Sequence, residues 1–258
     1  DGGPPVRLAL EKGQQMVEVL TPARDQAAEV SVEIKANAET AQDTVTVGPV
    51  RKWTVYLMHH THLDIGYTHV QTEVEEMQWQ HIETALGLIE KTADYPPEAR
   101  FKWLPEGLWA VDSYLKRATP EQRTAFLDAV RAGSIGLDAL YGNQLTALCR
   151  PEELIELTGY ARRLVKETGI TIDTAMISDV PGYTWGLIPV LAQSGVKYLS
   201  IGPNAGHRIG FTLKAWGDKP FYWVSPSGKE EVLCWMVGMA YSWFHSGKMT
   251  DGERIVTY

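Results

Sequence analysis

Cysteines, basic clusters and long apolar runs are scarce in this sequence. Only two cysteines, Cys149 and Cys234, occur among 258 residues, and both lie in apolar or mixed segments. We therefore expect buried free thiols, with a single disulfide as the alternative. No apolar run reaches the length of a membrane span, so we expect no membrane insertion. Lys and Arg do not cluster and the formal net charge is −8, which argues against nucleic acid or an anionic membrane surface as the main partner.

The two ends of the chain also lack familiar signals. The chain begins with Asp1-Gly2-Gly3-Pro4-Pro5, without Met and without a charged-then-apolar leader. Such a start suits a mature exported protein, so we expect a secreted or periplasmic location, although a chain cut at a linker looks the same. The apolar end at residues 255–258 suggests that the chain is part of a longer protein. No feature of the sequence indicates an oligomeric state.

The hydrophobic content of 44% and the nine Trp are enough for a sizeable core, and the chain divides into two regions. Residues 1–49 contain no His, Cys or Trp, so we expect no chemistry there. Alternating apolar and polar residues predict strands at 6–10, 16–20, 30–34 and 44–47. We predict that residues 1–49 form a small β-rich module with a packing or spacer role, and carbohydrate binding is the alternative.

Residues 50–258 alternate strand-like and helical patterns, which predicts an α/β domain with parallel strands. A helix is expected at about 73–91. A second helix opens at Thr119 with a capping box and closes at Gly133, and a third runs from 151 to 169. Residues 221–229 are typical of a hairpin. Strands are predicted at 53–58, 101–104, 134–140, 174–177, 196–201 and 232–236.

One stretch, His60 to Tyr67, stands out for its chemistry. It follows the predicted strand at 53–58, and in an extended strand alternate side chains share a face. His60, His62 and Asp64 would then point the same way and form a ligand set for zinc or a similar divalent ion. The alternative is that they are polar residues at a strand end, satisfied by hydrogen bonds.

A second candidate lies after the predicted strand at 174–177. In parallel α/β folds, reactive residues gather at the carboxyl ends of strands, and Asp179 falls at such an end. Tyr183 and Trp185 bring aromatic faces close to it. Asp179 would ligate the metal, act as a nucleophile, or do both; alternatively, it caps the next helix. Asn143 or Gln144, after another predicted strand, can serve sugar hydroxyls.

From about residue 53 to 235 the chain resembles the N-terminal catalytic region of glycoside hydrolase family 38, the retaining, zinc-dependent α-mannosidases. His60 to Tyr67 matches the family pattern His-x-His-x-Asp-x-Gly-aromatic. The resemblance implies zinc ligation by His62 and Asp64, and stacking of Tyr67 on the sugar. It also implies a (β/α)-barrel-like catalytic domain at 50–258.

Residues 177–183 resemble the family's nucleophile segment. The resemblance implies that Asp179 is both the catalytic nucleophile and a zinc ligand. From their place beside Asp179, Tyr183 and Trp185 are expected to contact the carbohydrate substrate. In the family a downstream His completes the zinc site and the general acid also lies downstream. His207 and His245 do not stand in that downstream motif, so both missing groups are expected beyond residue 258. Glu106 and Asp138 are the candidates for the acid within the chain.

Two other function classes stay open. A metal-dependent polysaccharide deacetylase also uses His and Asp ligands at strand ends, but the His-x-x-x-His pair usual in those enzymes is absent here. A non-catalytic carbohydrate-binding homologue is the other alternative, and the presence of His62, Asp64 and Asp179 argues against it. Mannose specificity is implied by the family alone.

Overall fold

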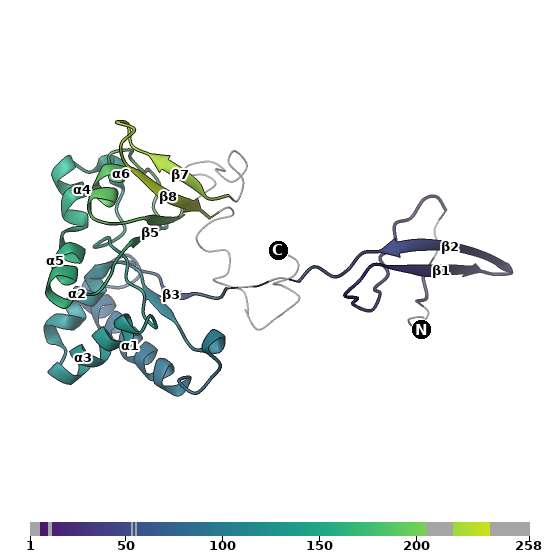
Figure 1. The fold of residues 1–258 in the computed structure, drawn as a ribbon, viewed down its shortest axis with the longest axis horizontal. Helices are drawn as coiled ribbons and strands as arrows, with labels where there is room; N and C mark the ends of the chain where they lie inside the picture. The colour runs from purple at the N-terminus through teal and green to yellow at the C-terminus, as the bar shows by residue number, and fades with distance from the viewer. Residues whose placement is uncertain (1–5, 10–11, 53, 55, 205–218, 238–258) are drawn as a thin grey trace. The chain divides into compact units, whose positions relative to one another are not determined.

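The computed structural model describes residues 6–9, 12–52, 54, 56–204 and 219–237 (Figure 1). The chain forms two compact units, Asp1–Leu57 and Met58–Tyr258. Within the described residues, no helix has both the length and the apolar character needed to cross a bilayer.

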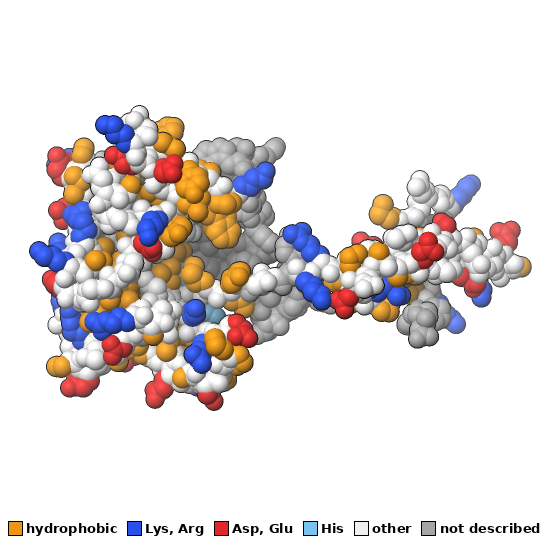
Figure 2. Space-filling view, viewed as in Figure 1, with side chains coloured by type: hydrophobic (Ala, Val, Ile, Leu, Met, Phe, Trp, Pro, Cys, Tyr) orange, Lys and Arg blue, Asp and Glu red, His pale blue; other side chains and the backbone are white. Residues whose placement is uncertain are grey.

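The first unit is built on an antiparallel ribbon of two strands, β1 (Ala28–Ala36) and β2 (Glu39–Val47). Asn37, with a positive φ of 55°, forms part of the turn between them. Apolar side chains of the ribbon are exposed, and Figure 2 shows hydrophobic groups on its surface. The predictions at 30–34 and 44–47 are confirmed.

The two other predicted N-terminal strands are wrong where the structure describes them, at 6–9 and 16–20. Met16 and Leu20 are 97% and 96% exposed and belong to no strand. An alternating pattern forms a strand only when a neighbouring strand satisfies its backbone N–H and C=O groups, and these segments pair with none among the described residues.

The second unit is organised around parallel strands. β3 pairs with β4, and β5, β6, β8 and β7 form a second sheet in that order, with only β7 antiparallel. Single parallel bridges, Trp103 to Ile135 and Asp138 to Thr174, place residues 135–138 between β4 and β5. The strands are β3 (His59–Thr61), β4 (Trp103–Pro105), β5 (Thr174–Ser178), β6 (Tyr198–Gly202), β7 (Phe221–Val224) and β8 (Glu231–Met236).

Helices cover the parallel strands, and the core lies between the two layers (Figure 1). Ile177 of β5 and Ile201 of β6 are fully buried, as are Ile188 and Leu191 of α6. The helices are α1 (Gln71–Lys91), α2 (Leu108–Arg117), α3 (Pro120–Arg131), α4 (Pro151–Leu157), α5 (Gly159–Thr168) and α6 (Leu187–Gln193).

The mixed α/β architecture is confirmed, whereas the described strands do not close into a barrel. The predicted strand at 53–58 is wrong for residues 54 and 56–58, because pairing begins only at His59. The predicted strand at 134–140 is reduced to two isolated bridges. The hairpin prediction is confirmed by β7 and β8.

Local sequence signals predict the boundaries of the helices well, but they predict the buried face of a helix less well. Thr119 and Gln122 form the predicted capping box of α3, and the predicted third helix breaks at Thr158 into α4 and α5. In α1 the buried stripe is Val74, Gln78, Ile82 and Ala85. The buried face thus includes a polar side chain, because the Gln78 amide donates to the main-chain oxygen of His62.

Candidate metal centre

His62 and Asp64 lie on the segment that leaves β3. The pairing of β3 with β4 ends at Thr61, and the backbone then carries His62, the buried Leu63 and Asp64 past the end of the sheet. The side-chain amide of Gln78, on α1, donates to the main-chain oxygen of His62 at 3.2 Å. Gly66 then turns the chain with a φ of 80°, a conformation that glycine adopts without strain.

Asp179 reaches the same place from β5, as its position at a strand end predicts. Its backbone has a positive φ of 65°, and its N–H donates to the Gly202 carbonyl at the end of β6 at 2.9 Å. Positive φ is uncommon outside glycine, although Asp tolerates it better than most residues, and such backbone outliers cluster at functional sites. The neighbouring strand therefore fixes the unusual turn at Asp179.

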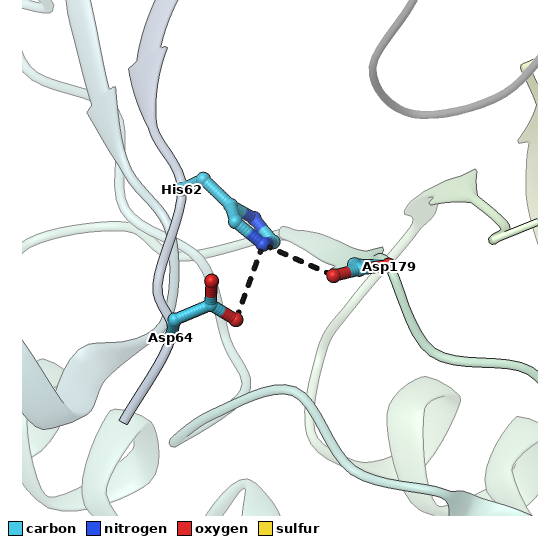
Figure 3. A group of neighbouring side chains, drawn as sticks. All are labelled: His62, Asp64 and Asp179. Carbon is cyan, nitrogen blue, oxygen red and sulfur yellow. Dashed lines mark ion pairs between the residues drawn. The ribbon is translucent and has the colours of Figure 1, made fainter. Parts of the chain in front are cut away.

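The three side chains converge on one point (Figure 3). His62 Nε2 lies 3.6 Å from an Asp64 carboxylate oxygen and 3.5 Å from Asp179 Oδ2. One ligand atom from each of the three residues lies within 4.8 Å of the others. His60, which strand alternation places with them, is not a member of this group, because β3 ends before His62 and the alternation does not continue.

Behind the imidazole lies Glu106, the residue that follows β4. Its Oε2 is 2.7 Å from His62 Nδ1 and accepts a hydrogen bond from the Leu63 N–H at 2.8 Å. Glu106 is only 1% exposed. The imidazole is therefore contacted by carboxylates at both ring nitrogens.

The charges of this cluster shift two pKa values. The hydrogen bond that His62 donates to Glu106 raises the pKa of His62; burial opposes this rise, and the nearby carboxylates of Glu106, Asp64 and Asp179 add to it. Burial alone would raise the pKa of Glu106, but hydrogen bonds from His62, Ser178 and the Leu63 N–H outweigh burial and lower it. Glu106 is thus a carboxylate that stays ionised.

The donor set fits a divalent transition metal. One imidazole nitrogen and two carboxylate oxygens from Asp64 and Asp179 are the ligand types that zinc accepts, and three protein ligands are characteristic of catalytic zinc sites. A cation here would also neutralise the negative charge that Asp64 and Asp179 concentrate around one ring nitrogen.

The aromatic candidates lie in different surroundings. Tyr67 is 85% exposed beyond the Gly66 turn. The Tyr183 hydroxyl donates to the Val180 carbonyl, which ties the turn after Asp179 together. Trp185 is 61% exposed and meets Trp223 of β7 edge to face, with ring centroids 6.4 Å apart. Tyr67 and Trp185 thus offer accessible ring surface, whereas Tyr183 is engaged in the loop.

Neither in-chain candidate for the general acid suits that role. Glu106 is buried against His62 and stays ionised. Asp138 is 2% exposed, and its Oδ1 accepts the N–H groups of Leu140 and Met176, so it bridges backbone segments. A general acid must reach the leaving oxygen of the substrate, which these buried groups cannot do. His207 and His245 lie outside the described residues.

Sequence reasoning also missed the contacts of two asparagines near Asp179. Asn204, two residues after β6, donates its amide N–H to Asp179 Oδ1, and no local motif marks that residue. Asn143, a candidate for sugar hydroxyls, uses its Oδ1 to accept the Ser178 N–H at 3.0 Å. Asn204 could have been found only from its place at the end of a neighbouring parallel strand.

Comparison with solved structures gives matches among glycoside-processing enzymes. An alpha-mannosidase from Enterococcus faecalis V583 matches with a TM-score of 0.58 and 18% identity, over 72% of this chain and 20% of that one. A glycosyl hydrolase family 38 protein from Enterococcus faecalis matches with a TM-score of 0.51 and 16% identity, over 70% and 18%. A 4-alpha-glucanotransferase from Thermococcus litoralis matches with a TM-score of 0.54 and 12% identity, over 78% and 30%.

These likenesses concern the fold, and the chain spans about one fifth of the length of the two Enterococcus proteins. Comparison with curated proteins gives no match. The family model described as the N-terminal domain of glycosyl hydrolases family 38 matches residues 52–255, which include the whole group of His62, Asp64 and Asp179. The chain therefore belongs to glycosyl hydrolase family 38 and carries the family's N-terminal domain.

Proposed function

We propose that this chain provides the metal centre and the nucleophile of a retaining α-mannosidase-like glycoside hydrolase. The observation that carries the proposal is the convergence of His62, Asp64 and Asp179 at the ends of β3 and β5. These three residues would hold a zinc ion, which when bound supplies a Lewis acid for neighbouring sugar hydroxyls.

Asp179 is the proposed nucleophile. In a retaining glycosidase a carboxylate oxygen attacks the anomeric carbon as the leaving-group oxygen departs, and water then hydrolyses the covalent intermediate. One Asp179 oxygen faces His62 while the other accepts a hydrogen bond from Asn204, so the carboxylate is oriented at both oxygens. A carboxylate oriented in this way loses little freedom when it attacks.

Tyr67 and Trp185 are the proposed sugar contacts, since their exposed ring faces suit the C–H groups of a pyranose. Tyr183 would act indirectly, through the turn that carries Asp179. We also propose that the general acid, a further zinc ligand and the strands that close a (β/α)-barrel come from outside the described residues. The parallel series from β3 to β8 is the open part of such a barrel.

A mannosyl fluoride with a second fluorine on the sugar ring tests this function directly. Fluoride leaves without protonation, so the missing acid is not required, and the ring fluorine slows hydrolysis of the intermediate. We expect attack of an Asp179 oxygen on the anomeric carbon, loss of fluoride, and one fluoromannosyl group per chain on the Asp179 peptide. Intact-protein and peptide mass spectrometry measure this product.

Two variants complete the test. Asp179→Asn should remove the label, and Asp173→Asn is the matched control, because Asp173 lies outside the metal group and pairs with Lys197 at the chain surface. A label on a residue other than Asp179, or its persistence in Asp179→Asn, would refute the assigned nucleophile. If the full-length protein binds mannose but none of its residues becomes labelled, that result would favour the non-catalytic homologue.

A further inference from the structure

We propose that Glu106 is a positioning residue for His62: its buried carboxylate fixes the imidazole with a proton on Nδ1 and the lone pair of Nε2 directed at the metal. The inference rests on the proposed metal centre and adds to it a residue that would not touch the metal. It follows from the strand register, the hydrogen bonds and the packing around Glu106.

The register of two short strands brings the pair together. Thr61 of β3 and Pro105 of β4 are the last paired residues of this parallel sheet, so His62 and Glu106 are the next residues on neighbouring strands. Equivalent positions on adjacent parallel strands lie about 5 Å apart, within side-chain reach of each other. The contact is thus set by the sheet and does not depend on a mobile loop.

The hydrogen bonds of Glu106 fix both the imidazole ring of His62 and the backbone at Leu63. Oε2 lies 2.7 Å from His62 Nδ1 and accepts the Leu63 N–H at 2.8 Å. An ionised carboxylate only accepts hydrogen bonds, so the proton of a neutral His62 ring must lie on Nδ1. Nε2 then carries the lone pair, and Nε2 is the atom that faces Asp64 and Asp179.

Packing around the next residue keeps Glu106 in place. Gly107 has a φ of 75°, and a Cβ added there would lie 3.0 Å from the Leu63 side chain and 3.2 Å from the Gly142 backbone. The backbone after Glu106 therefore packs directly on the segment that carries the metal ligands. Because Glu106 is 1% exposed, water cannot replace its partners, and a buried carboxylate without partners is costly.

Metal-binding histidines commonly donate their second ring N–H to a carboxylate, and mutation of such partners weakens metal binding roughly 10- to 100-fold. We therefore expect Glu106→Gln to weaken zinc binding by about that factor, measured by competition with a chromophoric chelator. Gln keeps the size of the side chain and one oxygen for the His62 Nδ1–H and Leu63 N–H groups but removes the negative charge that strengthens the hydrogen bond from Nδ1.

Asp112→Asn is the matched control. Asp112 is also a buried carboxylate and accepts hydrogen bonds from Tyr141 at 2.9 Å and Lys116 at 2.7 Å, outside the metal group. This variant should lose thermal stability yet bind zinc as the wild type does. If Glu106→Gln does not fold, Glu106→Asp replaces it, since it keeps the charge but withdraws the carboxylate from Nδ1.

A second readout needs no metal. Nitrogen NMR of the zinc-free chain, at a pH where the imidazole is neutral, should show His62 protonated at Nδ1 in the wild type and not in Glu106→Asp, whose shorter side chain withdraws the acceptor from Nδ1; His62→Asn assigns the signals. Unchanged zinc affinity in Glu106→Gln and an unchanged ring tautomer in Glu106→Asp would overturn the inference. A full-length wild-type protein that binds no zinc would refute the proposed metal centre instead, and the tautomer alone would then decide the role of Glu106.

Discussion

Asn204 is the single residue that most directly constrains the proposed nucleophile. Its amide donates to Asp179 Oδ1, while Oδ2 faces the imidazole of His62. A hydrogen bond to a charged group contributes about 1.5–3 kcal/mol, and 1.4 kcal/mol corresponds to a factor of ten. We predict that Asn204→Ala slows labelling of Asp179 by the fluorinated mannosyl fluoride about tenfold or more, because the carboxylate can then rotate.

The control for that prediction is another amide-to-alanine change in the same unit. Gln193 donates to Glu230 at the surface, at 3.4 Å, so Gln193→Ala removes a comparable contact away from the site. In this variant Asp179 should be labelled at the wild-type rate, which mass spectrometry measures over time. Equal rates for Asn204→Ala and the wild type would show that the sheet alone orients Asp179.

At the level of elements, Asp138 joins the segment at 135–138 to β5. Its Oδ1 accepts the Leu140 and Met176 N–H groups, both at 3.0 Å. Burial raises the pKa of Asp138 to about 8; the backbone hydrogen bonds oppose the rise, and the Glu106 charge adds to it. The folded chain therefore keeps this proton up to about pH 8, whereas the unfolded chain releases it near the ordinary value of 3.8.

The sign of the pH dependence follows from that difference. Between pH 3.8 and about 8 the folded state binds more protons than the unfolded state at Asp138, so its contribution to the free energy of unfolding falls as the pH rises. Asp138→Asn mimics the neutral acid and keeps an oxygen for both N–H groups. We predict that this variant loses that part of the pH slope and is more stable than the wild type at neutral pH and above.

Urea unfolding across the pH range measures this effect. Asp128→Asn is the control, since Asp128 is exposed at the end of α3 and pairs with Arg131. The control should retain the wild-type slope. A pH slope in Asp138→Asn equal to that of the wild type would mean that Asp138 is ionised in the folded chain and that its backbone hydrogen bonds outweigh burial.

Elements also explain how far the sequence predicts the site. Asp179 is predictable because reactive residues gather at the carboxyl ends of parallel strands, and Asp179 follows a recognisable strand pattern. His62 is predictable from its motif rather than from a strand pattern, since the strand before it is only the short β3. The contact between Glu106 and His62 is not predictable from the sequence, because it depends on the register of two three-residue strands. No local pattern encodes that register, and the hydrogen bonds that lower the pKa of Glu106 against the effect of burial keep it ionised, so it does not suit the role of general acid.

The same limit applies to the strands themselves. Thr119 and Gln122 predict the start of α3 because a capping box satisfies backbone donors within four residues. A strand has no such local partner for its backbone N–H and C=O groups. Residues 16–20 contain as many apolar residues as a strand needs but alternate only in part, whereas residues 30–34 alternate strictly and face a partner, β2, across a turn at Asn37. A strand therefore needs a pairing partner as well as an apolar pattern.

For the molecule as a whole, the division into two units bears on function. His62, Asp64, Glu106 and Asp179 all belong to the unit Met58–Tyr258. The other unit offers a two-stranded ribbon, an arrangement that is marginally stable by itself. The contacts described for the metal centre and the nucleophile thus all join residues of one unit.

We predict that deletion of residues 1–49 leaves zinc affinity and labelling of Asp179 at wild-type levels, because every contact described for the site lies after Leu57. Chelator competition and mass spectrometry measure both, with the Asp64→Ala chain as the control that should bind no zinc. The removed segment, made as a peptide, should show little strand signal in circular dichroism. Loss of zinc from the shortened chain, with its thermal unfolding unchanged, would instead make the N-terminal ribbon part of the site.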